Sequence, residues 1–204
     1  MTTKTAVLDN SPSLPMATVA EPAKGTFFVR IVGAAAFAHL LNDLIQAMLP
    51  SIYPMLKTQF SLSFSEIGMI ALIYQLTASL LQPWVGLYTD KHPKPYLLPV
   101  GMIVTLSGIV LLATVGSYPM LLVAAAVVGI GSATFHPEAS RVARMASGGR
   151  FGTAQSTFQV GGNTGSAIGP LLTAAIVIPH GQSAVAWFTV AALIAIAVLF
   201  HLTR

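Results

Sequence analysis

The chain alternates between long apolar runs and short polar connections, and this pattern predicts a bundle of six membrane-spanning helices. A helix needs about 20 mostly apolar residues to cross a hydrocarbon core of about 30 Å. Continuous runs of this length favour helices over barrel strands, which show short segments of alternating polarity. The predicted spans cover residues 29–56, 65–89, 96–115, 119–143, 153–178 and 184–202.

The predicted organisation is a disordered cytoplasmic tail at residues 1–27 and an all-α transmembrane bundle at residues 28–204. The tail is polar, contains proline and has no hydrophobic periodicity, which is typical of disorder. It also lacks the apolar core of a cleaved signal peptide. Because the connections between spans are short, we expect no soluble domain, and the function must reside inside the bundle.

The composition excludes several function classes. Hydrophobic residues make up 54% of the chain and charged residues 8%, whereas a soluble domain carries about 25% charged residues. The surface must therefore face lipid. The net charge of +4 comes from basic residues scattered between apolar runs, so we expect no nucleic-acid partner. The absence of cysteine excludes disulfides, thiolate metal sites and thiol nucleophiles.

The basic residues fall almost entirely on one side of the predicted spans. Only Lys57 lies on the other side. Given six crossings, the remaining nine share one side: Lys4, Lys24, Arg30, Lys91, Lys94, Arg141, Arg144, Arg150 and Arg204. Cytoplasmic loops of membrane proteins are enriched in Lys and Arg. The asymmetry therefore supports the count of six crossings with both termini of this chain in the cytoplasm.

The first span carries one polar face, formed by His39, Asn42, Asp43 and Gln46. These positions fall within an arc of roughly 100° on a helix. Asp43 follows Arg30 by roughly 20 Å of helix, which places it near the membrane middle. A carboxylate there costs about 2.5–3.5 kcal/mol to insert. We expect Asp43, together with His39 one turn away, to carry a coupling proton; a buried pair that only fastens helices is the alternative.

Spans 2 and 5 also carry polar stripes, whereas spans 3 and 6 hold no charged or amide residue in their interiors. The stripes contain Gln75, Ser79, Gln82 and Gly86 in span 2, and Gln155, Gln159, Gly162, Ser166, Gly169 and Thr173 in span 5. The amides either line a cavity or bond neighbouring helices, since they would be unsatisfied against lipid. Spans 3 and 6 are expected to face lipid. Two triplets of this kind indicate an inverted repeat of three helices.

The connection after span 2 reads Gly-Leu-Tyr-Thr-Asp-Lys-His-Pro-Lys over residues 86–94. It resembles the G-x-x-x-D-[RK]-x-G-x-[RK] loop signature of major facilitator superfamily transporters. Gly86, Asp90 and Lys91 match, while Pro93 and Pro95 depart from the pattern. The resemblance implies that these residues form a conformational latch at the cytoplasmic helix ends. A solvated charge pair in the loop is the alternative.

Span 5 contains Gly-Ser-Ala-Ile-Gly-Pro-Leu-Leu-Thr-Ala over residues 165–174. This run resembles the G-x-x-x-G-P-x-x-G-G signature of drug/proton antiporters in the same superfamily, although Thr173 and Ala174 replace the final glycine pair. Gly165, Gly169 and Pro170 are expected to form a helix kink, because proline removes a helix hydrogen bond. The Arg that such antiporters carry in span 4 is replaced here by Ala125, which indicates a narrower group.

Three segments resemble the fosmidomycin-resistance family within the superfamily. They are His-Leu-Leu-Asn-Asp at 39–43, Ala-Thr-Phe-His-Pro-Glu-Ala-Ser-Arg at 133–141, and Gln-Ser-Thr-Phe-Gln-Val-Gly-Gly-Asn at 155–163. The resemblance implies the N-terminal half of a twelve-helix carrier in the bacterial inner membrane. It implies a proton-coupled antiporter that exports a drug or small anion by alternating access, with the proton gradient as energy source and no cofactor.

The second of these segments adds further candidates. His136 and Glu138 either relay protons or form an ion cluster at a helix end. Arg141 lies three residues after Glu138 and can pair with it on one helix face; it is the candidate for binding an anionic substrate, with a positive-inside anchor as the alternative. The predicted substrate-binding set is Asn42, Gln46, Gln75, Gln82, Arg141, Gln155, Gln159 and Asn163.

The sequence leaves other interpretations open. The chain is either completed by a C-terminal six-helix half in the same polypeptide or pairs with a second copy as a homodimer. An importer of a small metabolite is an alternative to an exporter. A membrane-embedded enzyme is disfavoured, because Asp43 near the membrane middle and Glu138 near the cytoplasm do not cluster at one membrane face. We therefore expect no catalytic residues and no metal.

Overall fold

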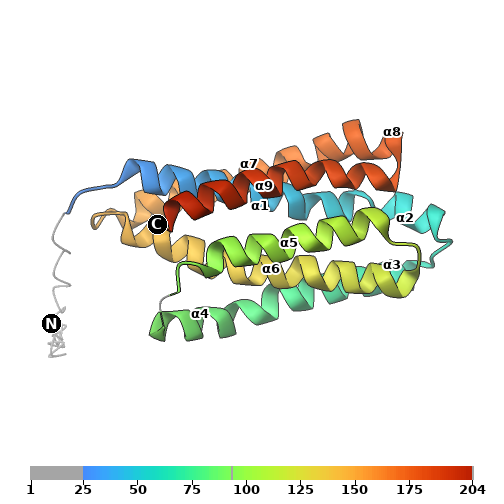
Figure 1. Ribbon diagram of the computed structural model, residues 1–204, viewed down its shortest axis with the longest axis horizontal. Coiled ribbons are helices and arrows are strands. Elements are labelled where there is room, and N and C mark those ends of the chain that lie inside the picture. Colours follow the sequence, from blue (N-terminus) through green and yellow to red (C-terminus); the bar gives the residue numbers. More distant parts are fainter. Residues whose placement is uncertain (1–24, 93, 204) are drawn as a thin grey trace, which may run out of the picture.

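The computed structural model describes residues 25–92 and 94–203, and within them six helical segments are long and apolar enough to cross a membrane. They are Val29–Ser51, Phe64–Lys91, Leu97–Thr114, Tyr118–Met145, Phe151–His180 and Gln182–Leu202. The predicted all-α bundle of six spans is confirmed (Figure 1). Most of the predicted tail, residues 1–24, lies outside the described residues, as do Pro93 and Arg204.

The first span ends earlier than the sequence predicted. Helix α1 covers Val29–Ser51, and a separate short helix, α2, covers Tyr53–Gln59. Pro54 explains the break, since proline has no N–H for the preceding turn and its ring clashes with the carbonyl four residues earlier. It sits instead in the first turn of α2, where a missing N–H costs nothing. The predicted end at Leu56 was therefore wrong.

Spans 2 and 5 are not regular α-helices throughout. Span 2 consists of α3 (Phe64–Gln75), the π-helical turn η1 (Leu76–Leu80) and α4 (Leu81–Lys91). Span 5 consists of α7 (Phe151–Leu172), the π-helical turn η2 (Thr173–Val177) and the short α8 (Ile178–His180). Pro170 lies in the last turn of α7. The irregular turn in span 5 thus begins three residues after the proline that the sequence singled out.

Helices α1 and α6 occupy the middle of the bundle. Helix α7 packs along α1, while α5 (Leu97–Thr114) packs along α6 (Tyr118–Met145). Helix α9 (Phe188–Leu202), preceded by the 3₁₀ turn η3 (Gln182–Trp187), packs on both α1 and α5. Span 2 packs mainly on α6. Because α1 and α6 also contact each other, polar side chains from both can meet inside the bundle.

Both ends of the described chain lie at the same end of the bundle (Figure 1). This end also carries the loop after α4 and the loop between α6 and α7, whereas α2 and α8 lie at the opposite end (Figure 1). The described basic residues that were predicted to be cytoplasmic occupy helix termini or loops at the first end. Lys57 belongs to α2 and lies at the other. The charge segregation inferred from the sequence is thus matched by the arrangement of the helices.

The spans differ in how much apolar surface they leave exposed. Helices α5 and α9 each bury one face and expose another, as expected for helices that face lipid; the exposed residues include Val100, Ile103, Leu193 and Ile194. Span 2 is less buried than either. Of the residues in its most apolar 18-residue stretch, 17% lie buried inside the bundle. Its exposed large apolar residues are Phe64, Met69, Leu72, Leu76, Leu80, Leu81, Trp84, Leu87 and Tyr88.

Glycines on α7 allow its backbone to approach α1 closely. A Cβ atom at Gly161 would overlap the Ala36 carbonyl oxygen, and one at Gly165 would overlap that of Leu40. One turn further, a Cβ at Gly169 would lie 2.6 Å from the Leu44 carbonyl oxygen. Small residues at this spacing permit close helix contact in membranes, where van der Waals packing drives association. The contact between α1 and α7 therefore depends on glycine at these positions.

We expect Gly161→Ala to weaken the bundle, because the added methyl group forces α7 away from α1. Overpacking of this kind costs about 1–3 kcal/mol of unfolding free energy. Thermal unfolding of the purified chain in detergent measures the effect. Gly152→Ala on the same helix is the matched control, because its Cβ would meet no atom within 4 Å. Equal melting temperatures for the two variants would contradict the proposed constraint.

Candidate functional site

The polar face of α1 points into the bundle and forms one wall of the candidate site. His39 and Asn42 are buried, while Asp43 and Gln46 are partly buried. Their spacing of three and four residues places all four on one side of the helix. The sequence-based prediction of a single polar face is consistent with this placement.

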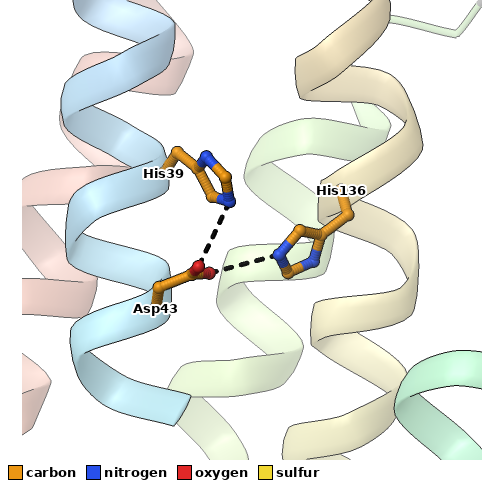
Figure 2. A group of neighbouring side chains, drawn as sticks. All are labelled: His39, Asp43 and His136. Carbon is orange, nitrogen blue, oxygen red and sulfur yellow. Dashed lines mark hydrogen bonds and ion pairs between the residues drawn. The ribbon is translucent and has the colours of Figure 1, made fainter. Parts of the chain in front are cut away.

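Asp43 lies between two histidines from different helices (Figure 2). Its Oδ2 is 3.3 Å from His39 Nε2, one turn earlier on α1, and its Oδ1 is 3.1 Å from His136 Nε2 on α6. The His39 side chain is 3% exposed, whereas those of Asp43 and His136 are 17% and 23% exposed. The sequence placed His39 beside Asp43, but the third member, 93 positions away, comes from the packing of α6 on α1.

Two amide side chains on α1 complete the surroundings of the carboxylate. Asn42 Nδ2 and Gln46 Nε2 donate to Asp43 Oδ1 at 3.1 and 3.3 Å. Gln46 Oε1 in turn accepts from the hydroxyl groups of Tyr74 on α3, at 2.6 Å, and Ser132 on α6, at 3.0 Å. Three helices are thus connected through one amide. Tyr74 and Ser132 were not predicted, since a lone hydroxyl in an apolar helix gives no signal in the sequence.

Each histidine is oriented by a backbone carbonyl group. His39 Nδ1 lies 2.9 Å from the carbonyl oxygen of Phe158 on α7, and its ring stacks on the Phe158 ring with centroids 4.0 Å apart. His136 Nδ1 lies 3.0 Å from the carbonyl oxygen of Ser132. A carbonyl oxygen only accepts, so each Nδ1 carries the proton and each Nε2 faces Asp43. Phe158, another residue that the prediction missed, therefore fixes one ring.

Gly162 on α7 makes room for this cluster. A Cβ atom at this position would lie 2.6 Å from His39 Nε2 and 2.8 Å from Asp43 Oδ2. Any side chain here would displace the two groups. The sequence suggested only that Gly162 belonged to a stripe of small and polar residues.

A cavity of about 360 Å³, called the central cavity below, opens beside the histidines. Its lining residues are His39, Asp43, Gln82, His136, Pro137, Ser140, Gln155, Phe158 and Gln159. Three of the predicted substrate-binding amides are therefore brought together. The Ser140 hydroxyl donates to Gln155 Oε1 at 3.1 Å, and Gln159 Nε2 donates to Asn163 Oδ1 at 3.2 Å. Asn163 lies one turn beyond the lining, and Gln75 lies on the exposed surface of α3, outside it.

Glu138 and Arg141 form a second centre, separate from the first. Glu138 is fully buried, and its Oε2 accepts from Arg141 Nη2 at 2.8 Å. Neither residue lines the central cavity. This pair agrees with the predicted contact between residues three positions apart on one helix face. The assignment of Glu138 to proton coupling and of Arg141 to substrate binding stays a prediction.

Arg141 lines a larger cavity of about 560 Å³ at the end of the bundle, together with Asp90 and Arg144. Asp90 and Lys91 lie exposed at the end of α4, and Gly86 faces Pro137 of α6, to which an added Cβ would make ordinary contact at 3.7 Å. Asp90 and Lys91 therefore lie at a helix end, whereas Gly86 lies in the middle of α4 at its contact with α6. The central cavity is nevertheless the better candidate site, because a carboxylate, two imidazoles and several amides converge there.

A comparison with protein families gives a match to the family described as Major Facilitator Superfamily over residues 35–204. The match covers all six spans apart from the first turns of α1. It agrees with the helix count and with the short connections between spans.

Two individual proteins are similar to this chain. The Fosmidomycin resistance protein of Escherichia coli (strain K12) is 61% identical over 174 residues, which are 85% of this chain and 43% of that protein. The Uncharacterized MFS-type transporter YfnC of Bacillus subtilis (strain 168) is 44% identical over 187 residues, which are 92% of this chain and 45% of that protein. The chain thus spans less than half the length of these relatives.

We expect Arg141→Gln to destabilise the fold by about 3–5 kcal/mol, because it leaves the buried Glu138 carboxylate without its charged partner. The double variant Glu138→Gln/Arg141→Gln should recover a large part of the loss, since no uncompensated charge remains. Unfolding of the purified chain in detergent measures both. Arg144→Gln, at an exposed neighbouring position, is the control. A double variant less stable than Arg141→Gln would contradict this account.

Proposed function

The chain belongs to the Major Facilitator Superfamily, and from this premise we propose that it carries a small-molecule substrate across a membrane by alternating access. The observation that carries the proposal is the Asp43 carboxylate, held between two imidazoles beside a polar cavity inside the bundle. Ionisable groups at this depth are costly, and they mark substrate or ion pathways in membrane proteins. Transport requires no cofactor, and the proton gradient supplies the energy.

Asp43 is the proposed coupling carboxylate, with His39 and His136 as its partners. The three groups come from both central helices, α1 and α6. A change in their number of bound protons alters the charge at the contact between these helices. Such a change favours one of two packings of the bundle over the other. A proton or ligand has this effect only if it binds the two packings with unequal affinity. Glu138 lies outside this cluster, and we propose for it a structural pairing with Arg141.

The proposed cargo is a drug or small anion that leaves the cell in exchange for protons. Support comes from the similar Escherichia coli protein, whose name records fosmidomycin resistance. Gln82, Gln155 and Gln159 line the central cavity and offer amide donors to the cargo, with Asn163 adjacent. Arg141 lines the larger cavity at the end of the bundle. It is proposed to contact anionic cargo as the cargo enters the carrier. Import of a small metabolite is the second candidate and uses the same cavity.

A second six-helix bundle is proposed to complete the carrier, because the chain spans less than half the length of its relatives. This bundle is either a C-terminal half of the same polypeptide or a second copy of the chain. Two exposed surfaces are available to it. One is the polar face of α7, with Gln159 and Asn163, and the other is the apolar face of span 2 around Leu76 and Trp84.

The proposed location is the bacterial inner membrane, with residues 25 and 203 on the cytoplasmic side. The support is the excess of arginine and lysine at the end of the bundle where these residues lie, since cytoplasmic loops attract such residues.

We expect Asp43→Asn to abolish proton-coupled transport while leaving the protein in the membrane. An amide of the same shape keeps the packing but holds no exchangeable acidic proton, and removing a proton-transfer group typically costs about 100-fold or more in rate. The measurement is fosmidomycin resistance of cells that express the complete carrier, together with immunodetection of the protein in membranes.

Glu66→Gln is the matched control for this substitution. Glu66 lies in the first turn of α3, where it forms a capping box with Ser63, and glutamine also serves in this motif. Resistance should be unchanged in this variant. Wild-type resistance in Asp43→Asn, at equal amounts of protein, would remove Asp43 from the coupling role.

The orientation is tested by single cysteines, since the chain has none of its own. Thr58→Cys in α2 and His92→Cys after α4 occupy exposed positions at opposite ends of the bundle. A membrane-impermeant maleimide added to intact cells should label Thr58→Cys and leave His92→Cys unlabelled until the cells are opened. The reverse pattern would show that the two ends are exchanged.

A further inference from the structure

His39, Asp43 and His136 form a ligand set of the kind that binds metal ions. Among the described residues, this is the group of three His, Cys, Asp or Glu side chains whose ligand atoms all lie within 4.8 Å of one another. Neither the family match nor the similar proteins' names indicate a metal at this place. The arrangement therefore needs an explanation of its own.

The hydrogen bonds of the two histidines leave an excess of acceptors at the centre. Each Nδ1 donates its proton to a backbone carbonyl oxygen, of Phe158 for His39 and of Ser132 for His136. A neutral imidazole then presents the Nε2 lone pair. Both Nε2 atoms face Asp43 oxygens at 3.1–3.3 Å, and an ionised carboxylate only accepts. Lone pairs cannot bond one another, so protons or a cation must lie between them.

Two kinds of positive charge satisfy this requirement. Protons on both Nε2 atoms make two imidazolium ions, which donate to the carboxylate. A single divalent metal ion between the same atoms supplies an equal charge and accepts all three lone pairs. Exchange of two protons for one divalent ion is therefore neutral in charge inside the bundle, where an uncompensated charge is costly.

The distances between ligand atoms fit a first-row transition metal. Such ions bind imidazole nitrogen and carboxylate oxygen at about 2.0–2.2 Å, so two ligand atoms of one ion lie about 3.0 Å apart in an octahedral site and about 3.4 Å apart in a tetrahedral site. The two histidine-to-carboxylate separations, 3.3 Å from His39 Nε2 to Oδ2 and 3.1 Å from His136 Nε2 to Oδ1, fall in this interval. The ligand atoms of the three residues all lie within 4.8 Å of one another, and the side chains close around the ion when it binds.

The groups around the three ligands also match those of metal centres. Metal-bound histidines donate their other N–H to a carbonyl or carboxylate group, and bound carboxylates accept hydrogen bonds. Here both imidazoles donate to carbonyl oxygens, and Asn42 and Gln46 donate to Asp43. The central cavity lies on the open side of the three ligands. Water or an oxygen-bearing cargo can complete the coordination from that side.

We propose that His39, Asp43 and His136 bind one divalent transition-metal ion of the zinc class at the edge of the central cavity. Imidazole nitrogens favour Zn²⁺, Co²⁺ and Ni²⁺, whereas Mg²⁺ and Ca²⁺ prefer oxygen ligands. The inference rests on the geometry of the ligands and not on the proposed transport. The ion competes with protons for the centre, either as a second coupling ion or as an inhibitor.

The test is equilibrium binding of Co²⁺ and Zn²⁺ to the purified chain in lipid nanodiscs, with an affinity tag that contains no histidine. Cobalt in a mixed histidine and carboxylate site absorbs visible light, and Zn²⁺ should displace it with one ion per chain. The site substitutions are made in a background variant that carries His92→Gln, His180→Gln and His201→Gln. In this triple variant only the two histidines of the site remain. These three positions are exposed, and the triple variant should bind Co²⁺ as tightly as the wild type.

Asp43→Asn and His136→Gln should each weaken binding by about 100-fold or more, since loss of a direct ligand exceeds the 10- to 100-fold effect of changing a supporting group. Zn²⁺ should raise the melting temperature of the background variant and leave that of Asp43→Asn unchanged, because a ligand stabilises only the state that binds it. Melting without metal verifies that each variant is folded.

Two results would overturn the proposal. One is the absence of saturable 1:1 binding in the wild type at about 1 mM metal, which corresponds to a binding free energy weaker than about 4 kcal/mol. The other is binding that survives both ligand substitutions and disappears in the triple histidine background. Neither result affects proton coupling at Asp43, and loss of transport in Asp43→Asn does not by itself support metal binding.

Discussion

The arrangement of the bundle follows from one constraint, which is that a carboxylate placed among apolar helices needs partners for its lone pairs. Asp43 obtains them from two imidazoles and two amides. Two of these partners are in turn held by other helices: His39 by the Phe158 carbonyl of α7, and Gln46 by Tyr74 of α3 and Ser132 of α6. Four helices are therefore fixed relative to one another by the satisfaction of a single acidic group.

This polar network depends on close backbone packing, which the glycines of α7 permit. Gly161 and Gly165 bring α7 against the carbonyl groups of α1, and Gly162 leaves space for His39 and Asp43. The distance from the Phe158 carbonyl oxygen to His39 is set by the same contact. Helix packing and the chemistry of the site are consequently not independent in this protein. A change in the contact between α1 and α7 alters the orientation of an imidazole that faces the carboxylate.

The bundle contains two separate charged centres, and they differ in what they can do. The pair of Glu138 and Arg141 balances its charges, with the carboxylate fully buried, so it is suited to hold the end of α6 in one arrangement. The cluster around Asp43 is partly exposed to a polar cavity and holds two imidazoles that can gain or lose a proton or a metal ion. The Asp43 cluster can therefore exchange protons or ions with its surroundings, while the Glu138–Arg141 pair can only be broken at a cost in free energy.

The sequence by itself determined the number of spans, their orientation relative to one another and the polar face of α1. Hydrophobic run length and charge distribution are local properties, and a helix places residues 39, 42, 43 and 46 on one face wherever it packs. The pairing of Glu138 with Arg141 also follows from their spacing of three residues on one helix. Only the tertiary structure decided that His136 joins Asp43 and that Glu138, two residues later, stays outside this cluster. It also decided that Gln75 faces outward and that Tyr74, Ser132 and Phe158 support the site. These outcomes depend on the rotation and depth at which α3, α6 and α7 pack against α1, and no local pattern encodes either quantity.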